Sequence, residues 1–132
     1  MATQSQNQSQ NIDPVAHYNW NLPTASDWGI TITEQNEDGT PMNITGARYL
    51  LTVKNRLQDN DAIAPISKSF TSSAPLTGVV AVGFDAEESE NMSDYTDYQT
   101  YFYDLKKVQS GVVTTLMAGQ MTFHKSATVR TV

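Results

Sequence analysis

The sequence predicts an all-β fold: a single Ig-like antiparallel β-sandwich of about seven strands, with a flexible polar N-terminal arm. Three observations predict it: apolar and polar residues alternate in several short runs, helical periodicity is nearly absent, and turn-forming residues separate the runs. The chain has 132 residues, no internal repeat and no cysteine. A single domain of this size buries about two-thirds of its surface, which is enough for a core without disulfides.

The arm is predicted from composition. Residues 1–11 are almost entirely Gln, Asn, Ser, Ala and Thr, and such a segment cannot bury enough apolar surface to offset the entropy of ordering it. We therefore divide the chain into an arm, residues 1–13, and a β-sandwich domain, residues 14–132. The arm is either a passive tail or an assembly arm that orders against a neighbour, with Ile12 and Val15 as its apolar anchors.

The clearest strand is predicted over residues 28–33, where Trp28, Ile30 and Ile32 alternate with glycine and threonine. Similar patterns predict further strands over residues 17–22, 46–55, 66–71, 78–85, 98–107 and 112–125. The last range forms either one strand or two strands broken near Gly119.

Two tight turns separate predicted strands. Asp38-Gly39-Thr40-Pro41 and Ser110-Gly111 are expected to form hairpin turns, because glycine tolerates positive φ and proline fixes φ before an extended segment. After the first turn, Ile44 is expected to start burial and Gly46 to allow a close approach or a bulge.

One short helix is predicted over residues 86–92. Asp85 is placed to cap it, and Glu87 and Glu88 in its first turn interact favourably with the helix dipole. Because the segment lies between two predicted strands, we expect it to be a crossover between the sheets.

The charge distribution argues against two classes of partner. The formal net charge is −6, no lysine or arginine precedes Arg48, and the range 69–105 contains neither, so a nucleic-acid-binding surface is not expected. No apolar run is long enough to span a membrane. The N-terminus also lacks the basic and apolar regions of a secretory signal, so we expect synthesis in the cytoplasm.

The sequence offers little for catalysis or metal binding. His17 and His124 are far apart, and there is no HExxH, no GxSxG and no glycine-rich phosphate loop. The acidic range 85–94 could bind calcium, but it lacks EF-hand spacing, so a solvated, helix-capping role is favoured. We expect no catalytic residue, no metal site and no cofactor, and hence a protein that is not an enzyme.

Several aromatic residues cluster late in the chain: Tyr95, Tyr98, Tyr101, Phe102 and Tyr103. An exposed cluster would be a platform for a carbohydrate. A strand would instead place Tyr101, Tyr103 and Leu105 on one face, in the core. Phe102 and Asp104 would lie on the opposite face, with Asp104 pointing outward or pairing with turn amides. The core interpretation is favoured.

Three pieces of the chain share the layout of a known class of domain. The first runs from Trp28 through the Asp38-Gly39-Thr40-Pro41 turn to Gly46, the second covers residues 101–105, and the third runs from Gly111 through Gly119 to residue 130. This layout resembles small β-sandwich domains in virion proteins of tailed bacteriophages, such as baseplate upper proteins, fibre N-terminal domains and head-decoration proteins. The structural turn and strand signature that carries the resemblance is Trp28, Asp38, Gly39, Pro41, Gly46, Tyr103, Asp104, Gly111 and Gly119.

The resemblance implies a non-enzymatic virion structural protein: a capsid decoration or cement protein, or an accessory subunit of the neck, tail or baseplate. Its partners would be other virion proteins, in repeated copies within a symmetric assembly, with no nucleic acid and no membrane. Its location would be the virion, after synthesis in the host cytoplasm. In fibre and baseplate proteins a stalk or receptor-binding module usually follows the sandwich, so a chain ending at Val132 favours a stand-alone subunit.

Two other functions compete with this one. A carbohydrate- or receptor-binding β-sandwich module would use the tyrosine cluster and His17-Tyr18-Asn19-Trp20 as its platform. A small hydrolase or metal enzyme is the third candidate.

Overall fold

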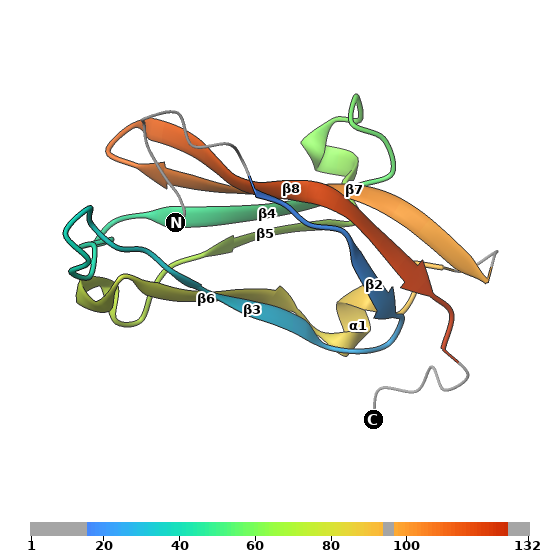
Figure 1. The fold of residues 1–132 in the computed structure, drawn as a ribbon. Helices are drawn as coiled ribbons and strands as arrows, with labels where there is room; N and C mark the ends of the chain where they lie inside the picture. Colours follow the sequence, from blue (N-terminus) through green and yellow to red (C-terminus); the bar gives the residue numbers. More distant parts are fainter. Residues whose placement is uncertain (1–15, 94–96, 127–132) are drawn as a thin grey trace.

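Two β-sheets packed face to face make up the structure, a computed structural model that describes residues 16–93 and 97–126 (Figure 1). The strands are β1 (Ala16–His17), β2 (Trp20–Pro23), β3 (Trp28–Thr33), β4 (Arg48–Lys54), β5 (Ile66–Phe70), β6 (Val79–Phe84), β7 (Tyr98–Gln109) and β8 (Val112–His124). The short helical segments are η1 (Asp61–Ile63), η2 (Pro75–Thr77) and α1 (Ala86–Ser89). This architecture confirms the predicted β-sandwich.

The larger sheet has the strand order β1-β8-β7-β4-β5, with β2 also paired to β8, and the smaller sheet consists of β3 and β6. Because β1 and β2 follow one another along β8, they form one interrupted edge strand, which leaves about seven strands as predicted. Pairing is antiparallel except that β1 and β2 run parallel to β8. Strands β1 and β2 lie at one end of the described chain and β8 lies at the other. Because no hairpin connects them, the chain connection does not require antiparallel pairing.

The predicted strands and helix agree with the structure to within a few residues, and α1 is the predicted crossover between the sheets. The Asp85 side chain accepts a hydrogen bond from the Glu88 amide, and the Glu88 side chain accepts one from the Asp85 amide. This capping box stabilises the first turn.

Strand β8 is continuous, so the alternative of a break near Gly119 is wrong. The break instead falls in the neighbouring edge strand, at Tyr18 and Asn19 between β1 and β2. A Cβ atom at Gly119 would overlap the Tyr18 carbonyl oxygen. Glycine is therefore required because the edge strand approaches β8 closely at this point.

The hairpin turn between β7 and β8 is confirmed. Ser110 and Gly111 have φ of 53° and 79°, and two consecutive positive φ values are typical of a type I′ hairpin turn. Its backbone twist matches that of the flanking strands, which explains how β7 and β8 can form a long, tightly connected hairpin.

The Asp38-Gly39 turn is also tight, with Gly39 at φ 87°. It does not join two strands of a sheet, however, but closes a small loop inside the β3–β4 crossover, bridged by Gln35 and Pro41. Gly46 has φ 81° and open space around its Cβ position. The expectation of a close approach there is wrong, and positive φ is the reason for the glycine.

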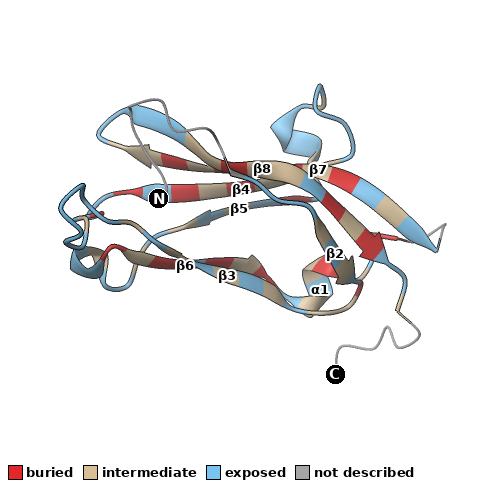
Figure 2. Ribbon diagram, in the orientation of Figure 1, coloured by how far each residue is buried: buried red, intermediate tan, exposed pale blue. Residues whose placement is uncertain are grey.

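The core lies between the sheets, where buried and less buried residues alternate along the strands (Figure 2). Tyr101, Tyr103 and Leu105 point into it, as predicted, and Ile44 is 1% exposed. The Tyr101 hydroxyl donates to the Met92 carbonyl at 2.8 Å, so this buried phenol is satisfied.

A polar cluster fixes the β3–β4 crossover against β7. Lys107 Nζ lies 3.1 Å from Glu34 Oε2, the Tyr49 hydroxyl donates to the same carboxylate, and Lys107 is only 9% exposed. Removing one member of such a group would leave a buried charge without compensation. In the part of the chain that is described, no helix is long and apolar enough to cross a membrane.

Candidate functional site

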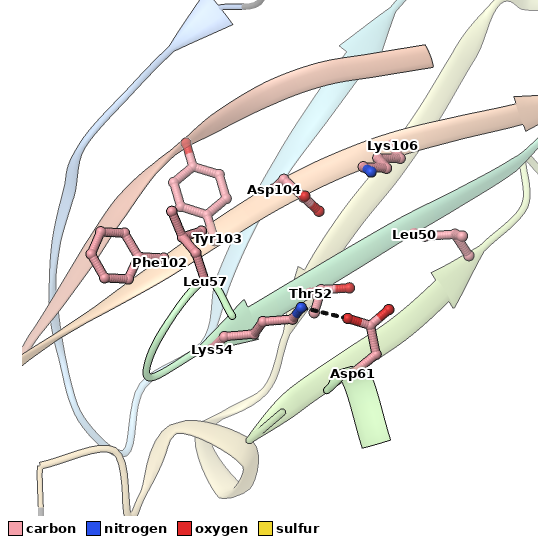
Figure 3. A pocket seen from close by; sticks show the side chains of 9 residues that line it. All are labelled: Leu50, Thr52, Lys54, Leu57, Asp61, Phe102, Tyr103, Asp104 and Lys106. Carbon is pink, nitrogen blue, oxygen red and sulfur yellow. Dashed lines mark ion pairs between the residues drawn. The ribbon is translucent and has the colours of Figure 1, made fainter. Parts of the chain in front are cut away.

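Two adjoining hollows of about 310 and 500 Å³ lie on the outer face of the larger sheet. Both are lined by Leu57, Phe102, Tyr103 and Asp104, and together we call them the outer-face hollow. Figure 3 shows the side chains that line the first of the two. The connection between β4 and β5, which contributes Leu57 and Asp61 to the lining, lies on the side of the larger sheet that faces away from β3 and β6 (Figure 1).

The floor of the hollow follows from strand alternation. Because successive side chains of a strand point to opposite faces, burial of Tyr103 and Leu105 in the core turns Phe102 and Asp104 outward. The register of β4 on β7 places Lys54 opposite Phe102 and Thr52 opposite Asp104.

One wall is the segment 55–65. Asn60 Oδ1 accepts a hydrogen bond from the Ala62 amide and caps η1, which presents Asp61 to Lys54. Lys54 Nζ lies 2.6 Å from Asp61 Oδ1 and 2.9 Å from the Asp59 carbonyl oxygen. Figure 3 shows this ion pair with Leu57 beside Phe102. Leu57 itself is 69% exposed, so the wall carries an uncovered apolar side chain.

The opposite wall comes from the edge strand and β8. His17 and Asn19 line the hollow together with Gln120. Asn19 Oδ1 accepts a hydrogen bond from the Gln120 amide at 3.0 Å, and so replaces a backbone acceptor where the edge strand is interrupted. Among the described residues, no group accepts a hydrogen bond from the Asn19 side-chain nitrogen Nδ2.

The two carboxylates of the hollow differ in their electrostatics. Burial raises the pKa of Asp104, although Lys106 and Lys54 oppose the shift. The hydrogen bond and charge of Lys54 lower the pKa of Asp61. Within the described residues, the Asp104 carboxylate forms neither a hydrogen bond nor an ion pair, so it can accept hydrogen bonds from a bound group.

The hollow therefore combines an aromatic ring with carboxylate and amide groups, a combination suited to a hydroxyl-rich ligand or a polar side chain of a partner. Among the residues that the structure describes, no group of three or more potential ligands could hold a metal ion. In the acidic range 85–94, Asp85 and Glu88 form the capping box. These two residues thus have the helix-capping role that the sequence pattern favoured over calcium binding.

The structure scatters the predicted signature over the molecule. Tyr103 and Asp104 lie at the hollow, and Gly119 is at its rim. Trp28 packs between the sheets, and the other signature residues occupy loops or turns: Asp38, Gly39, Pro41, Gly46 and Gly111. Ile12 and Val15 of the predicted assembly arm lie outside the described residues.

The predicted aromatic platform divides between two faces. Tyr101 and Tyr103 are buried, while Tyr98 is 61% exposed and Phe102 is half-buried on the outer face. Tyr95 lies outside the described residues. His17 and Asn19 of the proposed N-terminal platform do line the hollow, whereas Trp20 is half-buried against the core.

Sequence reasoning missed Leu57, Asp61 and Gln120 as lining residues. The first two lie in a connection whose fold over the sheet has no periodic signal. Gln120 is on the outward face of β8, and alternation from the buried Met121 could have placed it there.

No family model matches the chain, and no curated protein matches it in sequence. Solved structures that match the chain distantly include two with the following descriptions. The N-terminal domain of ORF48 from phage TP901-1 is 11% identical, with a TM-score of 0.33, and the match covers 86% of each chain. The periplasmic chaperone SfaE is 9% identical, with a TM-score of 0.40, and the match covers 88% of this chain and 57% of the chaperone. Both are distant likenesses.

Proposed function

We propose that this chain is a non-enzymatic structural subunit of a tailed-phage particle, a decoration protein of the capsid or an accessory protein of the neck, tail or baseplate. It acts by assembling with other virion proteins in repeated copies. The sequence layout that includes Trp28, Asp38-Gly39 and Gly119 supports the class, because it resembles domains of such proteins.

The observation that carries the assembly role is the placement of exposed apolar side chains. Leu57 and Ile63 in the β4–β5 connection are 69% and 66% exposed, and Val112 and Val113 beside the β7–β8 turn are 63% and 60% exposed. Adjacent exposed apolar residues mark interaction surfaces when a partner can cover them. Connections and hairpin ends are accessible to such a partner.

Ionisable groups that join different elements of the fold support a structural role as well. Glu34, Lys107 and Tyr49 contact one another, and Lys68 Nζ lies 2.8 Å from Glu88 Oε1. Each of these groups joins two elements of the fold. This use of charge suits a protein whose task is to hold its shape within an assembly.

The test compares the full chain with a variant that lacks residues 1–13. We expect the same thermal unfolding midpoint, because a polar arm contributes little to the core, but weaker incorporation into particles. Equal incorporation would show that the arm is a passive tail and that attachment uses the connections. Incorporation of neither protein would contradict the structural role.

The outer-face hollow favours a second candidate, a carbohydrate-binding module. Phe102 offers a ring face for stacking, while Asp104, Gln120 and the Asn19 amide offer hydrogen-bonding groups around it. A glycan array tests this function. Phe102→Ala should abolish any binding, whereas Val108→Ala, on the same outward row of β7 but outside the hollow, should leave binding unchanged.

A further inference from the structure

The smaller sheet has an open edge at β3. Strand β3 pairs only with β6 among the described residues. The Glu34 amide donates to the Gly78 carbonyl oxygen at 2.8 Å, next to the paired residues Thr33 and Val79. Glu34 therefore belongs to a hydrogen-bonded pair. Because hydrogen-bonded and non-hydrogen-bonded pairs alternate in antiparallel strands, every second residue before Glu34 does so too. The backbone groups of Trp28, Ile30 and Ile32 thus point to β6.

The remaining residues of β3 therefore direct their backbone groups outward. Gly29, Thr31 and Thr33 present their N–H and C=O groups to the open edge, and no hydrogen bond to another described backbone group satisfies their amides. All three residues are exposed. Unpaired backbone groups in a row form a template for another strand.

The inward side chains of β3 are also incompletely covered. Ile30 and Ile32 are half-buried, whereas Val80 and Val82 of β6 are 2% and 3% exposed. The indole Nε1 of Trp28 is buried and has no hydrogen-bond partner among the described residues. The inner side of the β3 edge is thus only partly covered by apolar side chains.

The other edges carry features that oppose pairing. Strand β5 contains Lys68, which points inward to Glu88, and inward charge on an edge strand discourages pairing. At the outer edge of β6, Val79 is bridged by Ala74. The β1 and β2 edge is interrupted and ends at Pro23. In contrast, β3 is uninterrupted and has no charge and no proline.

The sequence of β3 is complementary to itself. Antiparallel pairing of two β3 strands with Thr31 opposite Thr31 places Gly29 opposite Thr33, so all the outward backbone groups find partners. The same register places Ile30 opposite Ile32 on the inner face. It also places Trp28 opposite Glu34, whose carboxylate is already neutralised by Lys107. No unpaired charge enters the contact.

We propose that the open edge of β3 is the contact between two copies of this chain, which pair antiparallel about a two-fold axis through Thr31. The two small sheets then form one continuous sheet across the dimer. The proposal deepens the assembly role by naming a second copy as one partner of the subunit.

Sedimentation of the full chain over a range of concentrations tests the proposal. The wild type should form dimers. Thr31→Lys and Thr31→Asp should each weaken dimerisation by about two- to fivefold, because like charges meet at the axis. An equal mixture of the two variants should recover a heterodimer of about wild-type affinity, because opposite charges then meet.

Ala81→Lys is the matched control. Ala81 is exposed on the same face and pairs with Thr31, but it belongs to β6, so its substitution should leave dimerisation unchanged. Three results would overturn the proposal. They are a monomeric wild type, an unchanged dimer affinity in both Thr31→Lys and Thr31→Asp, and an equal mixture of these variants that stays monomeric. None of these results affects the particle-incorporation test. Failure of the dimer proposal can therefore be distinguished from failure of the proposed structural role.

Discussion

The indole Nε1 of Trp20 donates a hydrogen bond to the Tyr103 hydroxyl at 2.9 Å, and that hydroxyl donates to the Tyr18 carbonyl oxygen at 2.8 Å. The chain of hydrogen bonds joins the interrupted edge strand to β7 across β8. Burial raises the pKa of Tyr103, which keeps the phenol protonated and able to donate. The Tyr103 side chain therefore helps to hold the edge strand where its regular pairing with β8 is interrupted. The Tyr18 amide, which donates to the Ala118 carbonyl oxygen at 3.2 Å, and the Asn19 side chain also contribute there.

Replacing Tyr103 with Phe should lower the free energy of unfolding by about 1–3 kcal/mol, because the Tyr18 carbonyl and the Trp20 indole each lose a partner. Chemical denaturation measures the loss. Tyr18→Phe removes a hydroxyl from a side chain that is 53% exposed and should be nearly neutral. Equal effects of the two substitutions would show that the Tyr103 hydroxyl does not hold the edge strand.

Gly119→Val should detach the edge strand from β8, because any Cβ at Gly119 overlaps the Tyr18 carbonyl oxygen. We expect a loss of about 1–3 kcal/mol and faster hydrogen exchange at the amides of β2. Gln120→Val, at the next position and exposed, is the control. Unchanged exchange in the Gly119 variant would mean that the edge strand can shift without losing its pairing.

Strand positions were predictable because one face of each strand is buried. The row of Tyr101, Tyr103 and Leu105 identifies the inner face of β7 by its period of two. Parallel pairing of β1 and β2 with β8 was not predictable, because the two segments are about a hundred residues apart and no turn connects them. Gly119 signalled a special position, but only the structure shows that the break belongs to the neighbouring strand.

The stability of the protein should fall in alkaline solution through Tyr49. Burial and the adjacent Glu34 raise the pKa of Tyr49, so the folded state holds the phenol proton more tightly than the unfolded state. The stabilising contribution is fully present below the unfolded pKa of about 10 and declines as the pH rises above it.

Tyr49→Phe should therefore be less stable than the wild type at pH 8, and the difference in unfolding midpoint should shrink above pH 10. Midpoints measured from pH 8 to about 11.5 check this, with Tyr18→Phe expected to parallel the wild type. A constant difference between Tyr49→Phe and the wild type across that range contradicts the linkage.

Asp104 should destabilise the folded protein slightly at neutral pH. Because burial raises its pKa, the charged form is disfavoured in the folded state, and the penalty disappears as the pH falls below the unfolded pKa of about 4. Asp104→Asn should raise the midpoint at pH 7, with no gain at pH 3. Asp61→Asn should give no gain at pH 7, because its pKa is lowered by Lys54. A lower midpoint for Asp104→Asn would reveal a stabilising partner.

The candidate site was only partly predictable. Alternation along β7 placed Phe102 and Asp104 outward, and both line the hollow. One wall of the hollow depends on how residues 55–65 fold over the sheet. Contacts such as the ion pair between Lys54 and Asp61 hold this segment in place. A single ion pair of this kind leaves no repeated pattern in the sequence, so the hollow becomes visible only in three dimensions.

The structural role is tested most directly by quantitative mass spectrometry of purified phage particles from the source of this chain. Cleavage after lysine releases the peptide 108–125, which identifies the chain and measures its copy number. We expect this peptide in a fixed ratio to the major capsid or tail protein, and we expect that ratio to persist through gradient purification. Its absence from intact particles, with the chain present in infected cells, would contradict the proposed function.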